Sequence, residues 1–365
     1  GVGREQSNET YRGLTDADYA ANPNRRYAAS ERDNMRWWRT EARLTWRAEV
    51  GDHLRFVTDV YRHDFERSWL RFNRFGDESI GTRDVLLAPT GRRAVYYDVL
   101  TGAQDTSSPD ERIALIDNDR QYVSQGIQTR ARFEHRRGGM RHLLEAGVRL
   151  HHDSVDRQHT EHFFAMTSGS LVDLDESSVA TDNFDTAFAT SLYGVYGLTF
   201  WKFTVTPGVR AELVRTSRED DLTTLSTNSF DATVLPGVGL TYAVRRDLDL
   251  VAGVHRGYSP VGPGQEDRAD PETSIAYELG ARYQRPRRGR LLEVMGFVND
   301  YSNLLGQCAF STGCDAMRLD EQYNGGQVVV FGVEAVGTLR IDFGDVEVPL
   351  LATSSYTDSP VRLPL

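Results

Sequence analysis

Arginine side chains that lie beside aromatic or amide side chains are the groups in this sequence best suited to hold an anion. A guanidinium presents two parallel N–H donors to a carboxylate-like group, so each such place is a candidate contact for a negatively charged ligand. The alternative is that these arginines are solvated or paired with acidic loop residues. The candidate ligand contacts are Arg25, Arg26 and Tyr27; Arg92 and Arg93, near Tyr96 and Tyr97; and Arg256 with Gln265.

A histidine-rich segment is the second candidate. It begins with His151-His152-Asp153 and continues to His159 and His162. Imidazole and carboxylate together could bind a divalent metal. The spacing is irregular and matches no closed site, so we assign no metal site and interpret the segment as a solvated loop.

Two cysteines, Cys308 and Cys314, are separated by five residues in the segment Gly306–Asp315. Such a pair can close a small disulfide loop if the geometry fits, which suits an oxidising place outside the cytoplasm. The alternatives are two unpaired thiols or half of a metal site. The sequence has no other cysteine to complete a cysteine-rich zinc site.

Motifs of catalysis do not stand out. The sequence contains no Gly-x-Ser-x-Gly elbow, no phosphate-binding P-loop and no His-Glu-x-x-His. We therefore predict no enzyme and no covalently bound cofactor. The formal net charge of −11 argues against a nucleic-acid partner, because nucleic-acid binders usually carry a basic face.

The elements that must position these groups are β-strands. In the stretch Glu41–Val50, apolar residues alternate with polar ones, and the alternation resumes after a turn at Gly51-Asp52. A period of two indicates a strand with one apolar face and one polar face. Twelve segments show this pattern, in pairs joined by short turns near residues 51, 138, 201, 246, 287 and 343.

The connections alternate in length, which favours a membrane barrel over a soluble sandwich. Long connections are expected at about 66–125, 152–186, 215–231, 257–272 and 301–326. Short turns at one end and long loops at the other are typical of outer-membrane barrels. Only 39% of the residues are hydrophobic, which fits strands whose alternate residues meet lipid. The arginines of the polar rows, such as Arg43 and Arg149, should then face the lumen.

The two ends of the chain are interpreted as parts of a longer barrel. Residues 1–39 read as a strand end followed by a loop, with a short helix capped by Thr15. Residues 358–365 read as the start of a further long loop. We predict an all-β fold: a transmembrane, antiparallel, up-and-down β-barrel with about twelve or more strands in residues 1–365, treated as one partial domain.

Several stretches resemble TonB-dependent outer-membrane receptors, in particular the ferric-dicitrate type. The resemblance implies a 22-stranded barrel, a bacterial outer-membrane location, and uptake of ferric citrate or a ferric siderophore energised through TonB. It also implies a plug domain and last strands that are not visible in these residues, and it makes Arg25 and Arg26 part of a family-like loop. The stretches are Ser7–Tyr11 with Gly13–Asp18, Pro23–Ser30, Gly257–Pro260 with Pro263-Gly264, Tyr277–Gly280, Asn299–Leu304 and Tyr323–Gly326.

Two other hypotheses remain open at this stage. A smaller, complete outer-membrane barrel would act as a passive channel or a surface enzyme. A soluble β-sandwich would bind sugar or protein, and would have to seal the apolar rows inside a dry core. All three hypotheses are compatible with an acidic, strand-rich chain, but only the membrane hypotheses explain the sorted loops.

Overall fold

A computed structural model of the chain describes residues 1–285, 289–308 and 321–359. In this part of the chain, thirteen antiparallel strands form one sheet in which neighbours in sequence are neighbours in space. A second sheet pairs two short strands, β12 (Leu305–Gln307) and β13 (Gln322–Asn324). The strands of the main sheet are β1 (Val2–Ser7), β2 (Asn34–Val50), β3 (Leu54–Phe75), β4 (Ile113–Arg137), β5 (Met140–Thr167), β6 (Ser170–Phe200), β7 (Phe203–Asp220), β8 (Leu225–Arg245), β9 (Leu248–Ser259), β10 (Glu272–Arg285), β11 (Arg290–Asn303), β14 (Val328–Phe343) and β15 (Val346–Asp358).

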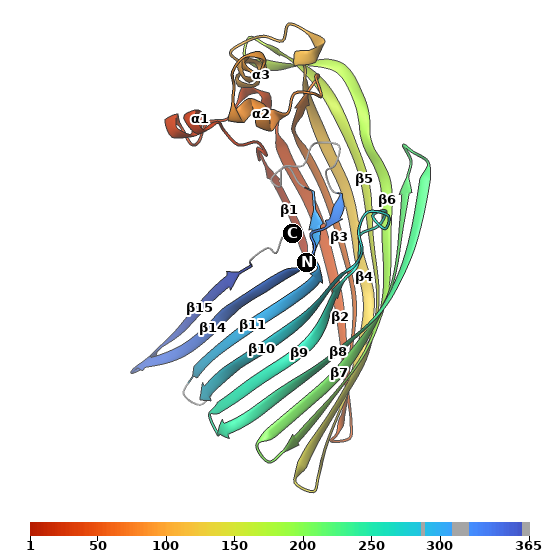
Figure 1. Ribbon diagram of the computed structural model, residues 1–365, viewed down its shortest axis with the longest axis vertical. Helices are drawn as coiled ribbons and strands as arrows, with labels where there is room; N and C mark the ends of the chain where they lie inside the picture. The colour runs from red at the N-terminus through yellow and green to blue at the C-terminus, as the bar shows by residue number, and fades with distance from the viewer. Residues whose placement is uncertain (286–288, 309–320, 360–365) are drawn as a thin grey trace.

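The predicted up-and-down antiparallel architecture is confirmed. The sheet curls into an open, barrel-like wall, and among the described residues β1 and β15 are edge strands (Figure 1). The short turns gather at one end of the wall, at the positions that the alternation predicted. The turn near 287 falls partly on residues 286–288, outside the described residues, as does most of the C-terminal segment 358–365.

The two faces of the sheet differ in polarity. The outer face carries large apolar side chains that remain exposed, among them Leu44, Val60 and Ile127. On the inner face, Asp59 accepts hydrogen bonds from the Arg43 Nε atom at 3.0 Å and from the Gln128 Nε2 atom at 3.2 Å. Such cross-strand polar pairs stabilise a wet face, whereas the exposed apolar rows require an apolar solvent.

The strands are longer than the alternation predicted, and the expected loops at 152–186 and 215–231 are wrong. β5 and β6 run for 28 and 31 residues and meet at a tight turn, Ser168-Gly169. β7 and β8 likewise continue to Asp220 and from Leu225. Beyond the apolar rows both faces of a strand meet water, so the backbone ladder continues while the apolar period disappears.

Three helices and two 3₁₀ turns form a cap over one end of the wall (Figure 1). Among the described residues, no helix is long and apolar enough to cross a membrane. α1 starts as predicted, with the Thr15 Oγ1 atom accepting the Asp18 backbone N–H. α3 ends at Gly102, whose φ of +81° is a left-handed conformation that suits glycine. The cap elements are α1 (Asp16–Ala21), η1 (Ala28–Ser30), α2 (Thr82–Leu87), α3 (Arg92–Thr101) and η2 (Pro109–Glu111).

The cap has its own hydrophobic core. Phe72 and Phe75 at the end of β3 pack with Val99 and Leu100 of α3 and with Met166 of β5, all fully buried. A cap built this way is folded onto the sheet by burial of apolar area. The main cluster also contains Tyr27, Ala29, Val85, Tyr96, Ile113, Leu115, Phe164 and Leu171.

Hydrogen bonds join the cap to the tip of the β5–β6 hairpin. The Thr106 backbone N–H donates to the Met166 carbonyl, and the Met166 N–H donates to the Thr106 Oγ1 atom, both at 2.8 Å. The Ser168 N–H donates to the Asp105 Oδ1 atom at 2.6 Å. Gly102 lies against Gly169, where a Cβ atom on Gly102 would come within 3.1 Å of the Gly169 Cα atom. The cap therefore connects the end of β3 to the far hairpin.

Candidate functional site

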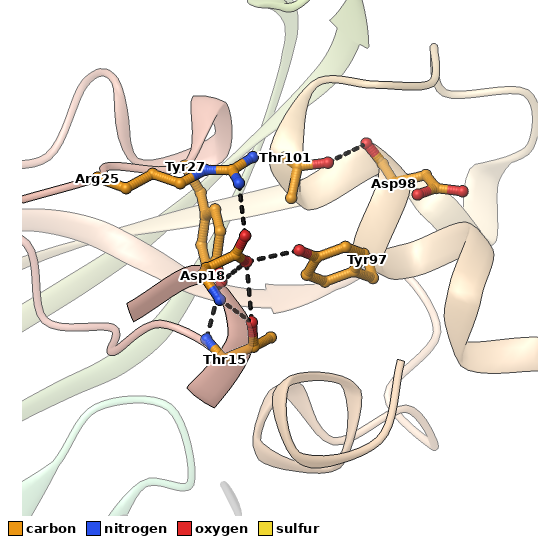
Figure 2. A network of polar contacts seen from close by, with 7 residues as sticks. All are labelled: Thr15, Asp18, Arg25, Tyr27, Tyr97, Asp98 and Thr101. Atoms are coloured by element: carbon orange, nitrogen blue, oxygen red, sulfur yellow. Dashed lines mark hydrogen bonds and ion pairs between the residues drawn. The ribbon is translucent and has the colours of Figure 1, made fainter. Parts of the chain in front are cut away.

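A polar network joins Arg25 and Tyr27, from the first predicted arginine cluster, to Asp18 and Tyr97 of the cap (Figure 2). The Asp18 Oδ2 atom accepts hydrogen bonds from the hydroxyls of Tyr27 at 2.6 Å and Tyr97 at 2.5 Å. The Arg25 Nη1 atom contacts the Asp18 Oδ1 atom at 2.5 Å. Asp18 therefore links the segment around α1 to α3, which lies almost eighty residues further along the chain.

The electrostatics of this network follow from burial and hydrogen bonding. Burial tends to raise the pKa of Asp18, but hydrogen bonds from Tyr27, Tyr97 and Thr15 and the charge of Arg25 outweigh it, so the pKa lies below its ordinary value. Burial and the bond to Asp18 raise the pKa of Tyr97 to about 12. Asp18 is thus an anion that binds neutral phenols, which is an arrangement suited to holding the cap together.

Most of the predicted ligand contacts make contacts within the protein. Tyr27 is buried, and the Arg26 Nη2 atom donates to the Asp33 carbonyl at 2.9 Å. Arg92 pairs with Asp77 at 2.5 Å, and Arg93 lies 3.8 Å from Asp84. The structure does not bring Arg25, Arg26, Tyr27, Arg92 and Arg93 together at one cavity, and their role in ligand binding stays a prediction.

A large polar cavity lies between the cap and the inner face of the sheet. Its volume is about 1170 Å³. Eight arginines and four carboxylates of the described residues line it, so its walls carry an excess of positive charge. The arginines are Arg12, Arg71, Arg74, Arg83, Arg120, Arg157, Arg218 and Arg268, and the carboxylates are Glu78, Asp84, Glu161 and Glu321.

Hydrogen bonds and ion pairs to carboxylates fix three of these arginines. The Arg74 Nε and Nη2 atoms donate to Glu161 at 3.0 and 2.6 Å. Arg157 and Arg218 converge on Asp185, whose side chain is only 2% exposed. The hydrogen bond to Asp185 raises the pKa of the Arg218 guanidinium above its ordinary value. Guanidinium groups held in this way have defined orientations before a ligand arrives.

His159 lies near several arginines, three of which belong to the same wall. It is 6% exposed, and its Nε2 atom accepts a hydrogen bond from the Arg120 Nε atom at 3.0 Å. Burial and the charges of Arg120, Arg157, Arg71 and Arg67 lower the pKa of His159 to about 3. The imidazole is therefore neutral at physiological pH. Its Nε2 atom orients Arg120 by accepting the hydrogen bond from that side chain.

Arg71 and Arg83 have the fewest internal partners in the cavity wall. Among the described residues, Arg83 on α2 makes no hydrogen bond or ion pair. The Arg71 guanidinium lies 4.6 Å from the centre of the Tyr11 ring, and its solvent-shielded Nη1 atom has no hydrogen-bond partner in the described part of the chain. The charges of both guanidinium groups therefore remain available to attract an anion that enters the cavity.

Gln265 is the one predicted contact that lines the cavity. It lies in the loop between β9 and β10, beside Gly264 and Arg268. Arg256 lies elsewhere, because it pairs in register with Ile275 on the outer face and borders a different hollow. Arg256 and Gln265 therefore lie apart in the structure, although the sequence predicted them as one candidate contact.

The histidine segment is part of strand β5, so its interpretation as a solvated loop is wrong. His151 contacts the Tyr61 hydroxyl at 2.6 Å and Asp153 at 2.8 Å, while His159 is buried in the cavity wall. No group of three or more His, Cys, Asp or Glu placed to hold a metal ion occurs among the described residues. Cys308 is buried, and Cys314 lies outside the described residues, so the disulfide stays a prediction.

Most residues of the cavity wall were not predicted from the sequence. Arg71, Arg120, Arg157 and Arg218 lie on strands where the apolar alternation has ended. A weaker signal was present, because Arg157, His159 and Glu161 still follow a period of two. That period places their side chains on one face of β5.

Comparisons with known proteins agree with this architecture. Residues 2–364 match the family described as TonB dependent receptor-like, beta-barrel. A comparison with curated protein sequences finds no match.

Solved structures share the fold at low sequence identity. They include the ferric citrate transporter FecA in its unliganded form, with a TM-score of 0.67, 20% identity, and coverage of 96% of this chain and 46% of that chain. The siderophore receptor PiuA from Acinetobacter baumannii gives a TM-score of 0.67 and 14% identity over 91% of this chain and 48% of that chain. The copper transporter OprC gives a TM-score of 0.55 and 14% identity over 89% and 48%.

The chain spans about half the length of these solved structures. The antiparallel wall, its sorted turns and the family match over nearly all residues agree. This chain belongs to the family of TonB-dependent receptor-like β-barrels.

Proposed function

We propose that this protein is an outer-membrane receptor for an anionic ferric chelate, ferric citrate or a siderophore, whose uptake is energised through TonB. The family consists of outer-membrane receptors and transporters, not enzymes. The observation that carries the proposal is the arginine-lined cavity of about 1170 Å³ between the cap and the sheet. Carboxylate and phenolate oxygens around ferric iron leave such chelates negatively charged, and arginine matches them.

The fold alone does not select this ligand, since the similar structures include a copper transporter. The wall chemistry does select against a free metal cation. Eight guanidinium groups would repel it, and the buried His159 is already an acceptor for Arg120. The iron is therefore cargo inside an anionic shell, and the protein contacts the shell. Contact with TonB would be made by a plug domain outside residues 1–365.

Binding measurements on the intact protein test the ligand. Arg83→Gln should weaken binding of ferric citrate about five-fold, because a partly exposed charge near a bound anion contributes about 1 kcal/mol. Arg71→Gln should weaken it more, since its guanidinium is half-buried. Arg246→Gln, in the turn at the opposite end of the sheet, is the matched control and should bind normally. Isothermal titration calorimetry at two salt concentrations measures all three.

Uptake measurements test the energised step. Cells that express the intact protein should accumulate radioactive iron from the chelate only when TonB is present. Accumulation that persists without TonB would instead support a passive channel. Wild-type affinity in both the Arg71 and Arg83 variants would remove the cavity from the proposal.

A further inference from the structure

The outer face of β2–β8 changes from apolar to polar over four residues. A row that is apolar except for Thr190 runs across neighbouring strands in register: Leu44, Val60, Ile127, Leu150, Thr190, Leu213 and Ala232. Two residues further toward the cap lies the boundary row: Arg62, Gln125, His152, Phe188, Arg215 and Phe230. The next row is polar except for Val123: Asp64, Val123, Ser154, Thr186, Ser217 and Asn228.

The boundary row lies where the headgroups of the outer lipid leaflet would meet the sheet. Arg62 lies nine residues after His53, and His152 lies thirteen residues after Gly139; these are the last residues of the turns that precede β3 and β5. A tilted strand needs about 9–11 residues to cross the hydrocarbon. The apolar row therefore faces acyl chains, and the boundary row faces the charged layer above them.

An apolar groove of about 660 Å³ lies on this part of the outer face. Its sides are Leu44, Val60, Ile127 and Leu150, and Phe188 borders it on β6. Arg62, Gln125 and His152 line its end toward the cap. The groove is open along the face that meets lipid, and its lining is suited to a hydrocarbon chain.

Arg215 stands beside this groove without an internal partner. Its register neighbours are Phe188 on β6 and Phe230 on β8, and the rings of both are exposed. It is exposed and makes no hydrogen bond or ion pair with another described residue. Arg62 differs, because it donates three hydrogen bonds to Asp64 and one to Gln125. Its charge is therefore already neutralised.

We propose that this surface is a binding site for a membrane lipid with a phosphate headgroup. The phosphate binds Arg215, and an acyl chain passes over Phe188 into the groove beside Leu150. Arginine presents a planar fork that matches phosphate oxygens, and the anionic charge of the lipid supplies the partner that Arg215 lacks. The site lies on the opposite face of the sheet from the arginine-lined cavity and is independent of the transported chelate.

Titration of the intact protein in a neutral detergent tests the proposal. Native mass spectrometry should show binding of dioleoyl phosphatidic acid, and much weaker binding of dioleoyl glycerol, which has the same chains without the phosphate. Arg215→Gln should weaken phosphatidic acid binding about five-fold, the effect of one arginine near an anionic lipid. Phe188→Ala should weaken both lipids, because the contact with the chain is lost.

Arg62→Gln is the matched control in the same row. It should change lipid binding little, since Asp64 already holds that charge. Wild-type binding by the Arg215 variant, or an equal loss in the Arg62 variant, would overturn the proposal. Full competition by millimolar inorganic phosphate would also overturn it, because a free anion would then suffice. Ferric citrate binding should be the same in wild type and Arg215→Gln, which separates this test from that of the proposed function.

Discussion

Asp185 and Arg218 are joined by two parallel hydrogen bonds, from the Nε atom at 2.7 Å and the Nη2 atom at 2.8 Å. The Asp185 carboxylate also contacts the Arg157 Nη2 atom at 2.8 Å, so one buried anion holds two cavity arginines. This relationship fixes the wall of the cavity across β5, β6 and β7. Under the proposed function, it also makes Asp185 a point at which stability and ligand binding are linked.

Asp185→Asn should lower the free energy of unfolding by about 3–5 kcal/mol, because removal of one partner leaves buried charges uncompensated. The midpoint of denaturant unfolding of the intact protein in lipid or detergent measures this loss. Glu219→Gln, at an exposed position near the end of β7, is the control and should leave the midpoint unchanged. An unchanged midpoint for both variants would show that the two arginines do not need the carboxylate.

A second prediction concerns pH and Asp33, which is 1% exposed. Burial raises the pKa of Asp33 from its ordinary 3.8 to about 6, although its Oδ1 atom accepts the Phe72 N–H at 2.9 Å. The folded state therefore holds the proton more tightly than the unfolded state. The contribution of Asp33 to stability is fully present below about pH 4 and is lost as the pH rises through about 6.

The size of this effect is on the order of 3 kcal/mol, since one pKa unit corresponds to about 1.4 kcal/mol. Asp33→Asn should remove this part of the pH dependence and leave the rest. Unfolding midpoints of both proteins, measured from pH 4 to pH 8, give the comparison. Parallel curves for wild type and variant would contradict the assignment to Asp33.

The cap core should be separable from the sheet. Phe75→Ala removes a fully buried ring and should cost about 3–5 kcal/mol of local stability. Limited proteolysis should then cut within residues 76–112 while the sheet stays resistant. Leu87→Ala on α2, where the side chain is 69% exposed, should leave the digestion pattern as in the wild type. Equal protection in both variants would argue against a core centred on Phe75.

Placing the same charge on the two faces of β10 tests the contact with lipid. Leu279 is 69% exposed on the outer face, so Leu279→Arg should cost about 2–4 kcal/mol in the middle of the bilayer. Glu278→Arg inserts the same side chain on the polar inner face and should lower the stability by only a fraction of the loss expected for Leu279→Arg. Insertion yield and heat resistance in lipid measure both changes. Similar losses from the two substitutions would mean that the outer face does not meet hydrocarbon.

The sequence predicted the strands that have one apolar and one polar face. Two such faces force a period of two, so these strands and the short turns near residues 51, 138, 201, 246 and 343 could be placed in advance. The helix after Thr15 was also predictable, because its capping contact with Asp18 is local. The extensions of β5 and β6 could not be predicted, because both faces of those segments meet water and carry polar residues.

The cavity was out of reach of the sequence for a different reason. Arg74 and Glu161 are 87 residues apart, and they meet because the register of β3, β4 and β5 brings them to one end of the sheet. The sequence instead drew attention to short-range motifs such as Arg25–Tyr27. In the structure, Arg25 pairs with Asp18, which also binds Tyr97, and these contacts stabilise the cap. The side chains that could bind a ligand are brought together by long-range pairing, which the local period of two along β5 does not specify.

The hydrogen bonds between Thr106 and Met166, and between Asp105 and Ser168, attach the tip of the long β5–β6 hairpin to the cap. A free-standing hairpin of this length would have to lose conformational entropy each time a solute docked against it. Here that loss occurs once, while the chain folds. A solute that contacts the hairpin would then not have to supply the free energy for ordering it, so more of the interaction free energy would contribute to affinity.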